Sequence, residues 1–149
     1  MSKQAKAVIK LLATGFYSGL SPVCPGTIGS LAALIVAYFW LQYFTVGFLL
    51  VLILTGVGTI ISQWAEKIYG EHDSPKIVID EWAGYFISLF GLGSTMLIPA
   101  FILFRIFDIL KPPPIKQLQD LPGGVGIMID DVLAGIMANL LLRLVIYFI

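Results

Sequence analysis

The feature that most constrains the fold is a long apolar part of the chain, from Leu31 to Ala65, in which no residue is charged. One helix over this range would rise about 50 Å at about 1.5 Å per residue, whereas the hydrocarbon core of a bilayer is only about 30 Å thick. We therefore predict two helices, from about Thr27 to Tyr43 and from about Phe48 to Tyr69. Thr45 and Gly47 mark the turn between them.

The composition indicates a chain that lives in a bilayer. Hydrophobic residues make up 58% of the sequence and charged residues 12%, against about 25% charged residues in an average soluble domain. The 149 residues are expected to form one membrane domain, 1–149. A net charge of zero gives no support to nucleic-acid binding, and one cysteine with one histidine exclude an internal disulfide and a multi-histidine metal site. No protein partner can be inferred.

Three further helices are expected in the second half of the chain. The uncharged run 82–104 contains GLGST at 91–95, which predicts a turn between helices over about Ile77–Phe90 and Thr95–Leu110. The last segment, Ile129–Ile149, is long enough to cross a bilayer once. Because proline cannot continue a helix, residues 111–124 are predicted to be a loop. The fold class is therefore all-α, a compact integral-membrane bundle of about five hydrophobic helices.

An N-terminal surface helix completes this bundle. Lys3, Lys6 and Lys10 alternate with apolar residues, which suits a short helix lying on the membrane. Lysines at this end also predict a cytoplasmic N-terminus. Since a helical hairpin returns the chain to its starting side, the acidic motifs described next and the stretch from Arg105 to Lys116 are expected together on the cytoplasmic face.

Acidic residues in the predicted membrane segments are the main functional candidates, because an unpaired carboxylate in a membrane is costly. Two motifs look alike: VIDEWAG at 78–84 and MIDDVLAG at 128–135. Each places two acids ahead of a glycine, and the acids are Asp80, Glu81, Asp130 and Asp131. We expect them in the first turns of helices, where the helix dipole favours negative charge. The alternative is that they only begin helices, which two such pairs beside a basic stretch disfavour.

The glycines of these motifs predict a close helix contact. Gly84 follows Asp80 by four residues and Gly135 follows Asp131 by four, so each glycine lies on the same helix face as an acid. A glycine on that face lets another backbone approach closely.

The stretch FRIFDILK at 104–111 adds cations to the set. In a helix, Arg105, Asp108 and Lys111 would form one stripe, with Arg105 and Asp108 able to pair. The alternative is a self-neutralised helix end at the membrane interface. Carboxylates without histidine or cysteine partners suit Mg²⁺, and an arginine with a lysine beside them suits a phosphate group.

Two glycine-rich segments are candidate phosphate loops. SGLSPVCPGTIGS at 18–30 could present Ser21, Thr27, Ser30 and backbone N–H groups to an anion at a helix N-terminus, although a simple turn and helix cap would use the same residues. GGVGIM at 123–128 lacks the Lys-Ser/Thr ending of a P-loop, and we interpret it as flexible backbone that leads into Asp130.

In this order and spacing, SGLSPVCPGTIGS, IVIDEWAG, FRIFDILKPPPIK and GGVGIMIDDVLAG resemble the phosphatidylglycerophosphatase A family. The resemblance implies a Mg²⁺-dependent lipid phosphatase of the bacterial inner membrane that converts phosphatidylglycerophosphate to phosphatidylglycerol. Its partners would be this phospholipid substrate and the surrounding membrane lipids. The family's polar blocks map onto seven positions here, namely Asp80, Glu81, Arg105, Asp108, Lys111, Asp130 and Asp131.

The residues and the resemblance together suggest a mechanism in which Mg²⁺ activates a water that attacks the phosphomonoester. The predicted metal ligands are Asp80, Glu81, Asp130 and Asp131. The predicted phosphate-binding residues are Arg105, Lys111, Thr27 and Ser21. Asp108 could orient Arg105, bind a metal or act as the base, and the sequence leaves all three open.

Two other classes of protein remain as alternatives. A small transporter also concentrates ionisable groups in membrane helices, but its acids would be distributed through the span. A non-catalytic, lipid-binding membrane scaffold would have no need of so many acids beside an arginine and a lysine.

Overall fold

A computed structural model describes residues 1–118 and 121–148, and within these residues the chain forms helices and no strand. The α-helices are α1 (Lys3–Ala13), α2 (Pro25–Trp40), α3 (Phe48–Tyr69), α4 (Ile79–Ser88), α5 (Leu97–Leu110), α6 (Ile115–Leu118) and α7 (Gly123–Phe148). Two single 3₁₀ turns, η1 (Ser18–Leu20) and η2 (Ser94–Met96), precede α2 and α5. The all-α prediction is confirmed.

The first hairpin, α2 and α3, agrees closely with its prediction. The bounds of α3 are those expected, and α2 ends at Trp40 instead of Tyr43. The Trp40 indole N–H donates a hydrogen bond of 3.2 Å to the Thr45 carbonyl, which stabilises the tight turn. The prediction of two helices with a turn near Thr45 is therefore confirmed.

The second hairpin also turns where the GLGST motif predicts. Gly91 has a φ of +66°, a left-handed conformation that glycine adopts without strain. At about 1.5 Å per residue, the ten residues of α4 rise only about 15 Å. Nearly every α4 residue is buried, so α4 is an internal helix surrounded by the longer ones.

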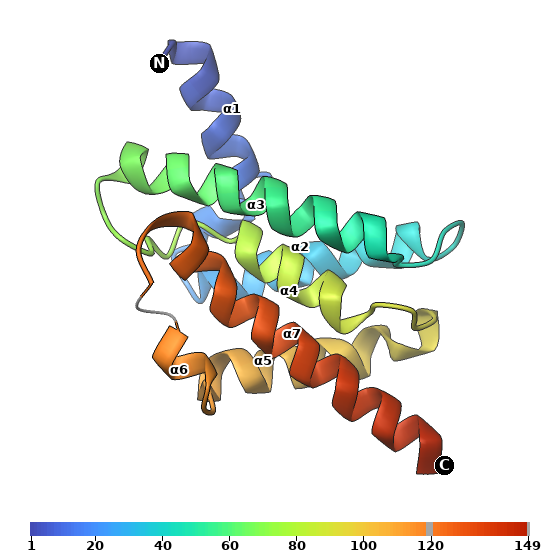
Figure 1. Cartoon of the computed structure of the whole chain (residues 1–149). Helices are drawn as coiled ribbons and strands as arrows, with labels where there is room; N and C mark the ends of the chain where they lie inside the picture. Colours follow the sequence, from blue (N-terminus) through green and yellow to red (C-terminus); the bar gives the residue numbers. More distant parts are fainter. Residues whose placement is uncertain (119–120, 149) are drawn as a thin grey trace.

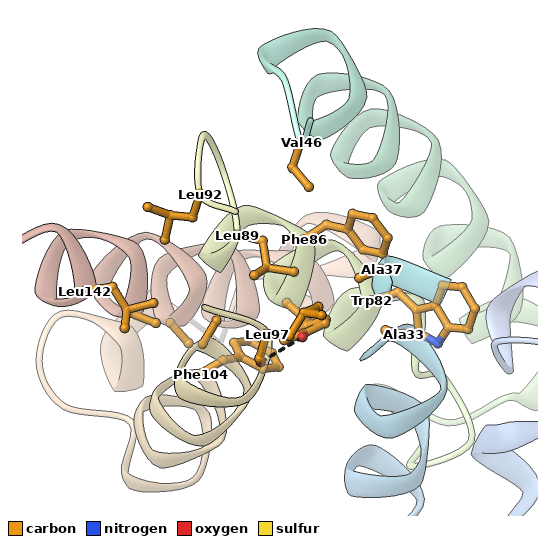
Figure 2. Packing of buried hydrophobic residues seen from close by; sticks show 14 of the residues in the cluster. Ala33, Ala37, Val46, Trp82, Phe86, Leu89, Leu92, Leu97, Phe104 and Leu142 are labelled. Carbon is orange, nitrogen blue, oxygen red and sulfur yellow. Dashed lines mark hydrogen bonds between the residues drawn. The ribbon is translucent and has the colours of Figure 1, made fainter. Parts of the chain in front are cut away.

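The main apolar core surrounds α4 (Figure 2). Trp82 and Phe86 lie next to Ala33 and Ala37, whose small side chains let α2 pack closely against α4. On the α5 side, the buried Tyr85 hydroxyl donates a hydrogen bond of 3.0 Å to a carbonyl, that of Leu97. The aromatic side chains of α4 thus join α2 to α5.

Helix α7 begins at Gly123, well before the predicted start at Ile129. The Gly124 N–H donates a hydrogen bond of 3.0 Å to the Gln63 side chain of α3, and a side chain at position 124 would collide with the α3 backbone. This contact holds the glycine-rich segment in a helix, so the prediction of flexible backbone was wrong. Ile149, the predicted last residue, lies outside the described residues.

The early start of α7 changes the position of its acids. Asp80 and Glu81 do lie in the first turn of α4, whereas no acid lies in the first turn of α7. Asp130 and Asp131 are instead two turns into α7, so that part of the prediction was wrong. The predicted loop 111–124 also contains α6 and the start of α7, and its residues 119–120 are outside the described part of the chain.

Helix α1 lies outside the bundle and packs against α3 (Figure 1). Ile9 and Leu12 pack with the small α3 residue Ala65, and the Lys10 ammonium lies 5.5 Å from the centre of the Tyr69 ring. The predicted surface helix is present, and its place on a membrane stays a prediction.

Within the described residues, α3 and α7 are the helices long and apolar enough to cross a membrane, and α2 is a shorter apolar helix. The five membrane helices that we predicted are therefore not confirmed. The outer faces of the longer helices do carry many exposed apolar side chains, among them Phe39, Leu49, Ile60, Ile102 and Leu140. Such faces fit contact with lipid tails better than contact with water.

Candidate active site

The two acidic motifs meet where α4 crosses α7. A Cβ atom added to Gly84 would lie 2.6 Å from the Asp131 carbonyl oxygen, and one added to Gly135 would collide with the Gly84 carbonyl oxygen. The glycines of the two motifs therefore permit a backbone-to-backbone approach, as predicted. Because each glycine follows an acid by four residues, this crossing brings Asp80 and Asp131 to the same place.

The acids line one small polar cavity of about 200 Å³. The start of α2, the loop before α4, helices α4, α5 and α7, and the residue after α5 contribute its lining residues, which are Pro25, Gly26, Asp73, Pro75, Ile77, Asp80, Glu81, Asp108, Lys111, Asp130 and Asp131. The acids were expected to meet in one place, and the structure brings all five predicted carboxylates together.

Within the cavity the carboxylates form two groups of three that share Asp131. Asp80, Glu81 and Asp131 each offer an oxygen within 4.8 Å of the others, and so do Asp108, Asp130 and Asp131. One buried oxygen on each of Asp80, Glu81 and Asp131 has no hydrogen-bond partner among the described atoms. Buried carboxylate oxygens without donors are strongly disfavoured unless a cation approaches them.

Arg105 lies beside the cavity and joins α5 to the start of α2. Its guanidinium pairs with Asp108, as predicted, and also donates to the Thr27 hydroxyl at 3.3 Å and the Ser30 hydroxyl at 3.4 Å. A Cβ on Gly26 would collide with the Glu81 carboxylate. The glycine at the start of α2 therefore leaves room for an acid of α4.

Lys111 reaches the cavity from the end of α5. It is not part of the helical stripe that we predicted, because α5 ends at Leu110 and Lys111 has a left-handed φ of +43°. Its ammonium donates a hydrogen bond of 2.6 Å to Asp130 of α7. Burial lowers the pKa of Lys111, but the hydrogen bond and charge of Asp130 outweigh burial and raise the pKa above its ordinary value.

Two other predicted residues lie at the edge of this arrangement or outside it. Thr27 reaches the site through its bond with Arg105. Ser21 does not line the acidic cavity, and its hydroxyl donates a hydrogen bond of 2.9 Å to the Val23 carbonyl instead. His72 pairs with Glu66 at 2.5 Å and does not line the cavity either.

The sequence interpretation missed Asp73. This residue stands in the loop before α4 and was not among the candidates, yet it lines the cavity. Its position seven residues before Asp80 could have been the signal, since a short loop keeps it near the start of α4. Ser30, one of the hydroxyls expected in the loop at 18–30, accepts a hydrogen bond of 3.4 Å from Arg105.

Comparisons with known proteins identify the family of the chain. The profile of the family described as Phosphatidylglycerophosphatase A matches residues 11–146. The chain is 40% identical to Phosphatidylglycerophosphatase A of Escherichia coli over 86% of this chain and 77% of that protein. Identity to Phosphatidylglycerophosphatase A of Haemophilus influenzae is 45% over 87% of this chain and 83% of that protein.

A relative from Bacteroides thetaiotaomicron, which carries the provisional name phosphatidylinositol-3-phosphatase, is 40% identical over 89% of both chains. No solved structure matches the chain significantly. The profile match spans most of the chain and includes all six carboxylates of the cavity together with Arg105 and Lys111. The chain belongs to the phosphatidylglycerophosphatase A family.

Proposed function

We propose that this chain is a phosphoric monoester hydrolase that converts phosphatidylglycerophosphate to phosphatidylglycerol and inorganic phosphate. The observation that carries the proposal is the convergence of six carboxylates, a lysine and a neighbouring arginine on one cavity. Relatives that carry the name Phosphatidylglycerophosphatase A cover most of the chain, which supports the choice of substrate.

The residues of the cavity fit Mg²⁺. Their donor atoms are carboxylate oxygens, which Mg²⁺ prefers to nitrogen or sulfur. Oxygens of Asp80, Glu81 and Asp131 are buried and lack a hydrogen-bond partner in the described part of the chain, so a cation would satisfy them. We propose these three residues and Asp130 as ligands. A bound divalent ion would supply positive charge to the phosphate and a water with a lowered pKa.

The residues of the chain perform the remaining tasks. Arg105 and Lys111 neutralise charge on the phosphoryl group, which is the main requirement of phosphoryl transfer. Asp108 holds the Arg105 guanidinium at the start of α2, where Thr27 and Ser30 fix its other side. As the water oxygen bonds to phosphorus, the bond from phosphorus to the glycerol oxygen breaks. A carboxylate takes a proton from the water and passes it to the glycerol oxygen, which leaves as a hydroxyl group.

We infer that the chain is a multi-pass protein of the bacterial inner membrane and that its cavity faces the cytoplasm. Under this proposal α2, α5 and the internal α4 lie in the membrane with α3 and α7. The lysines of α1 support the orientation, because α1 packs near the end of α3 and the cavity is lined by the loop that follows α3. Basic residues favour the cytoplasmic side.

The same geometry weighs against the two alternatives to a hydrolase. A transporter would need ionisable groups along a path through the membrane, whereas these acids gather in one cavity near the start of α4, the end of α5 and the third turn of α7. A scaffold gives no reason for buried carboxylate oxygens without partners.

The test is release of inorganic phosphate by the purified protein in detergent, with Mg²⁺ and with a chelator. Phosphatidylglycerophosphate and phosphatidylinositol-3-phosphate are compared as substrates, since relatives carry both names. We expect release from the first lipid that requires Mg²⁺ and is lost in Asp131→Asn. Glu71→Gln, which removes an exposed acid outside the cavity, is the matched control and should keep activity.

Absence of release from both lipids by folded protein would overturn the proposed function. Faster release from phosphatidylinositol-3-phosphate would keep the reaction and replace the substrate. Release that persists in the chelator would remove Mg²⁺ from the proposal.

A further inference from the structure

We propose that the cavity holds two divalent cations, bridged by Asp131. This inference rests on the proposed function and extends it by giving the number of metal ions and the ligands of each. The first site uses Asp80 and Glu81 of α4, and the second uses Asp108 of α5 and Asp130 of α7. Asp131 belongs to both groups of carboxylates that could hold a metal ion.

The two groups of carboxylates share Asp131 and differ in their other two members. Within each group the offered oxygens lie within 4.8 Å of one another, as expected around one ion. Asp131 is 3% exposed, lines the cavity and has one buried oxygen without a partner among the described atoms. A carboxylate with two oxygens can bridge two ions about 3.5–4 Å apart, which is the spacing of two-metal phosphatases.

The charges of the cavity also favour two ions. Asp108 pairs with Arg105 and Asp130 pairs with Lys111, but Asp80, Glu81 and Asp131 have no lysine or arginine at ion-pair distance among the described residues. One divalent ion would leave a negative charge there, and a phosphate group would add more. Two divalent ions would exceed the charge of these three carboxylates by one, which leaves a positive charge for the phosphate.

The two sites should differ in affinity. One oxygen each of Asp80 and Glu81 in the first site lacks a hydrogen-bond partner, so an ion that binds these oxygens displaces no hydrogen bond. In the second site, Arg105 and Lys111 already neutralise Asp108 and Asp130, so an ion must share these carboxylates with them. We expect the first site to fill at a lower metal concentration than the second.

Metal counting tests this inference without relying on activity. The full chain in detergent is stripped with a chelator and titrated with Mn²⁺, and bound metal per chain is measured by equilibrium dialysis. Electron paramagnetic resonance of the same samples reports whether two Mn²⁺ ions are magnetically coupled. We expect two ions per chain in the unaltered protein, with a coupled signal at saturation.

Single substitutions assign each ion. Asp80→Asn should leave only the weaker site and Asp108→Asn only the tighter one, both without coupling. Asp131→Asn should weaken both sites by at least about tenfold, as loss of metal-supporting groups commonly does. Asp73→Asn is the matched control, because Asp73 lines the cavity but belongs to neither group of carboxylates, and it should keep two ions.

Circular dichroism and gel filtration identify any variant that fails to fold, and Glu81→Gln then replaces Asp80→Asn as the probe of the first site. One ion per chain in a protein that still releases phosphate would overturn the two-ion inference and leave the proposed function standing. Absence of both metal binding and phosphate release would overturn the function as well. Loss of one ion in Asp73→Asn would overturn the ligand assignment.

Discussion

Gly84 of α4 and Gly135 of α7 face each other at the crossing of the two helices, and a methyl group on either would collide with backbone of the other helix. Each belongs to an acidic motif and follows an acid by four residues. The distance between these two backbones therefore sets the distance between Asp80 and Asp131. A change in the packing of α4 against α7 would therefore also change the geometry of the carboxylates.

Alanine at either glycine should force α4 and α7 apart. We expect Gly84→Ala and Gly135→Ala each to destabilise the protein by about 1–3 kcal/mol, the usual cost of overpacking, and to lower phosphate release from the folded fraction. Gly56→Ala is the control, because Gly56 lies in helix α3 with open space around it. Thermal unfolding in detergent compares the stabilities of the three variants. Equal stability of all three would contradict the prediction.

The C-terminal end of α4, away from the acidic cavity, allows the effect of a substitution on stability to be tested separately from its effect on activity. The buried Asn139 amide donates hydrogen bonds of 3.0 Å to the Ser88 and Phe90 carbonyls at the end of α4. Asn139→Leu leaves a buried carbonyl without a donor and should cost about 1–3 kcal/mol. Gln42→Leu, at an exposed amide, should cost far less.

Phosphate release per folded molecule should survive Asn139→Leu, because Asn139 does not line the acidic cavity. Unfolding temperature and release are measured on the same samples. A variant that folds as stably as the unaltered chain but loses activity would contradict the structural role assigned to Asn139.

Arg105 should be needed for rate more than for folding. Arg105→Gln removes the charge that faces Asp108 and should lower kcat by about 10²–10³-fold, as loss of one charge-stabilising donor does in other enzymes. Lys116→Gln removes an exposed cation outside the cavity and should leave kcat unchanged. Comparable kcat values for the two variants would remove Arg105 from the mechanism.

The single cysteine reports the side on which the cavity opens. Cys24 is exposed and directly precedes Pro25 and Gly26 of the cavity lining. A membrane-impermeant maleimide should label it in inside-out vesicles and not in intact spheroplasts. Tyr43→Cys in a Cys24→Ser background places the thiol in the α2–α3 turn at the other end of α2 and should show the reverse pattern. Labelling of Cys24 in spheroplasts would invert the proposed orientation.

Much of the fold could be predicted from local signals. The uncharged run that is too long for one crossing gave the α2–α3 hairpin, and the glycines at 91 and 93 gave the turn before α5. The start of α7 could not be predicted in this way. Glycines favour flexible backbone in isolation, and only the contact of Gly124 with α3 makes them helical.

The charged residues of the candidate site could be predicted from the sequence, but their arrangement in space could not. Paired acids ahead of glycines indicated which residues would meet, since an isolated carboxylate in an apolar segment requires a partner. The grouping around Asp131 and the pairing of Lys111 with Asp130 depend on how three helices cross. Lys111 follows Arg105 and Asp108 at a spacing of three residues, and this spacing predicts a helical stripe. The sequence pattern does not show that Lys111 itself adopts a left-handed conformation at the end of α5.

The position of Asp130 and Asp131 along α7 determines which measure of substrate concentration should set the rate. From Val132 to Phe148 the helix would rise about 25 Å at about 1.5 Å per residue, close to the thickness of a hydrocarbon core. If this part spans the core, Asp130 and Asp131 lie at the depth of the lipid headgroups, where a phosphomonoester already resides. The lipid then need not leave its leaflet to react. Turnover in mixed micelles should accordingly follow the mole fraction of substrate at the surface, and diluting the whole sample at fixed surface composition should leave the specific rate unchanged.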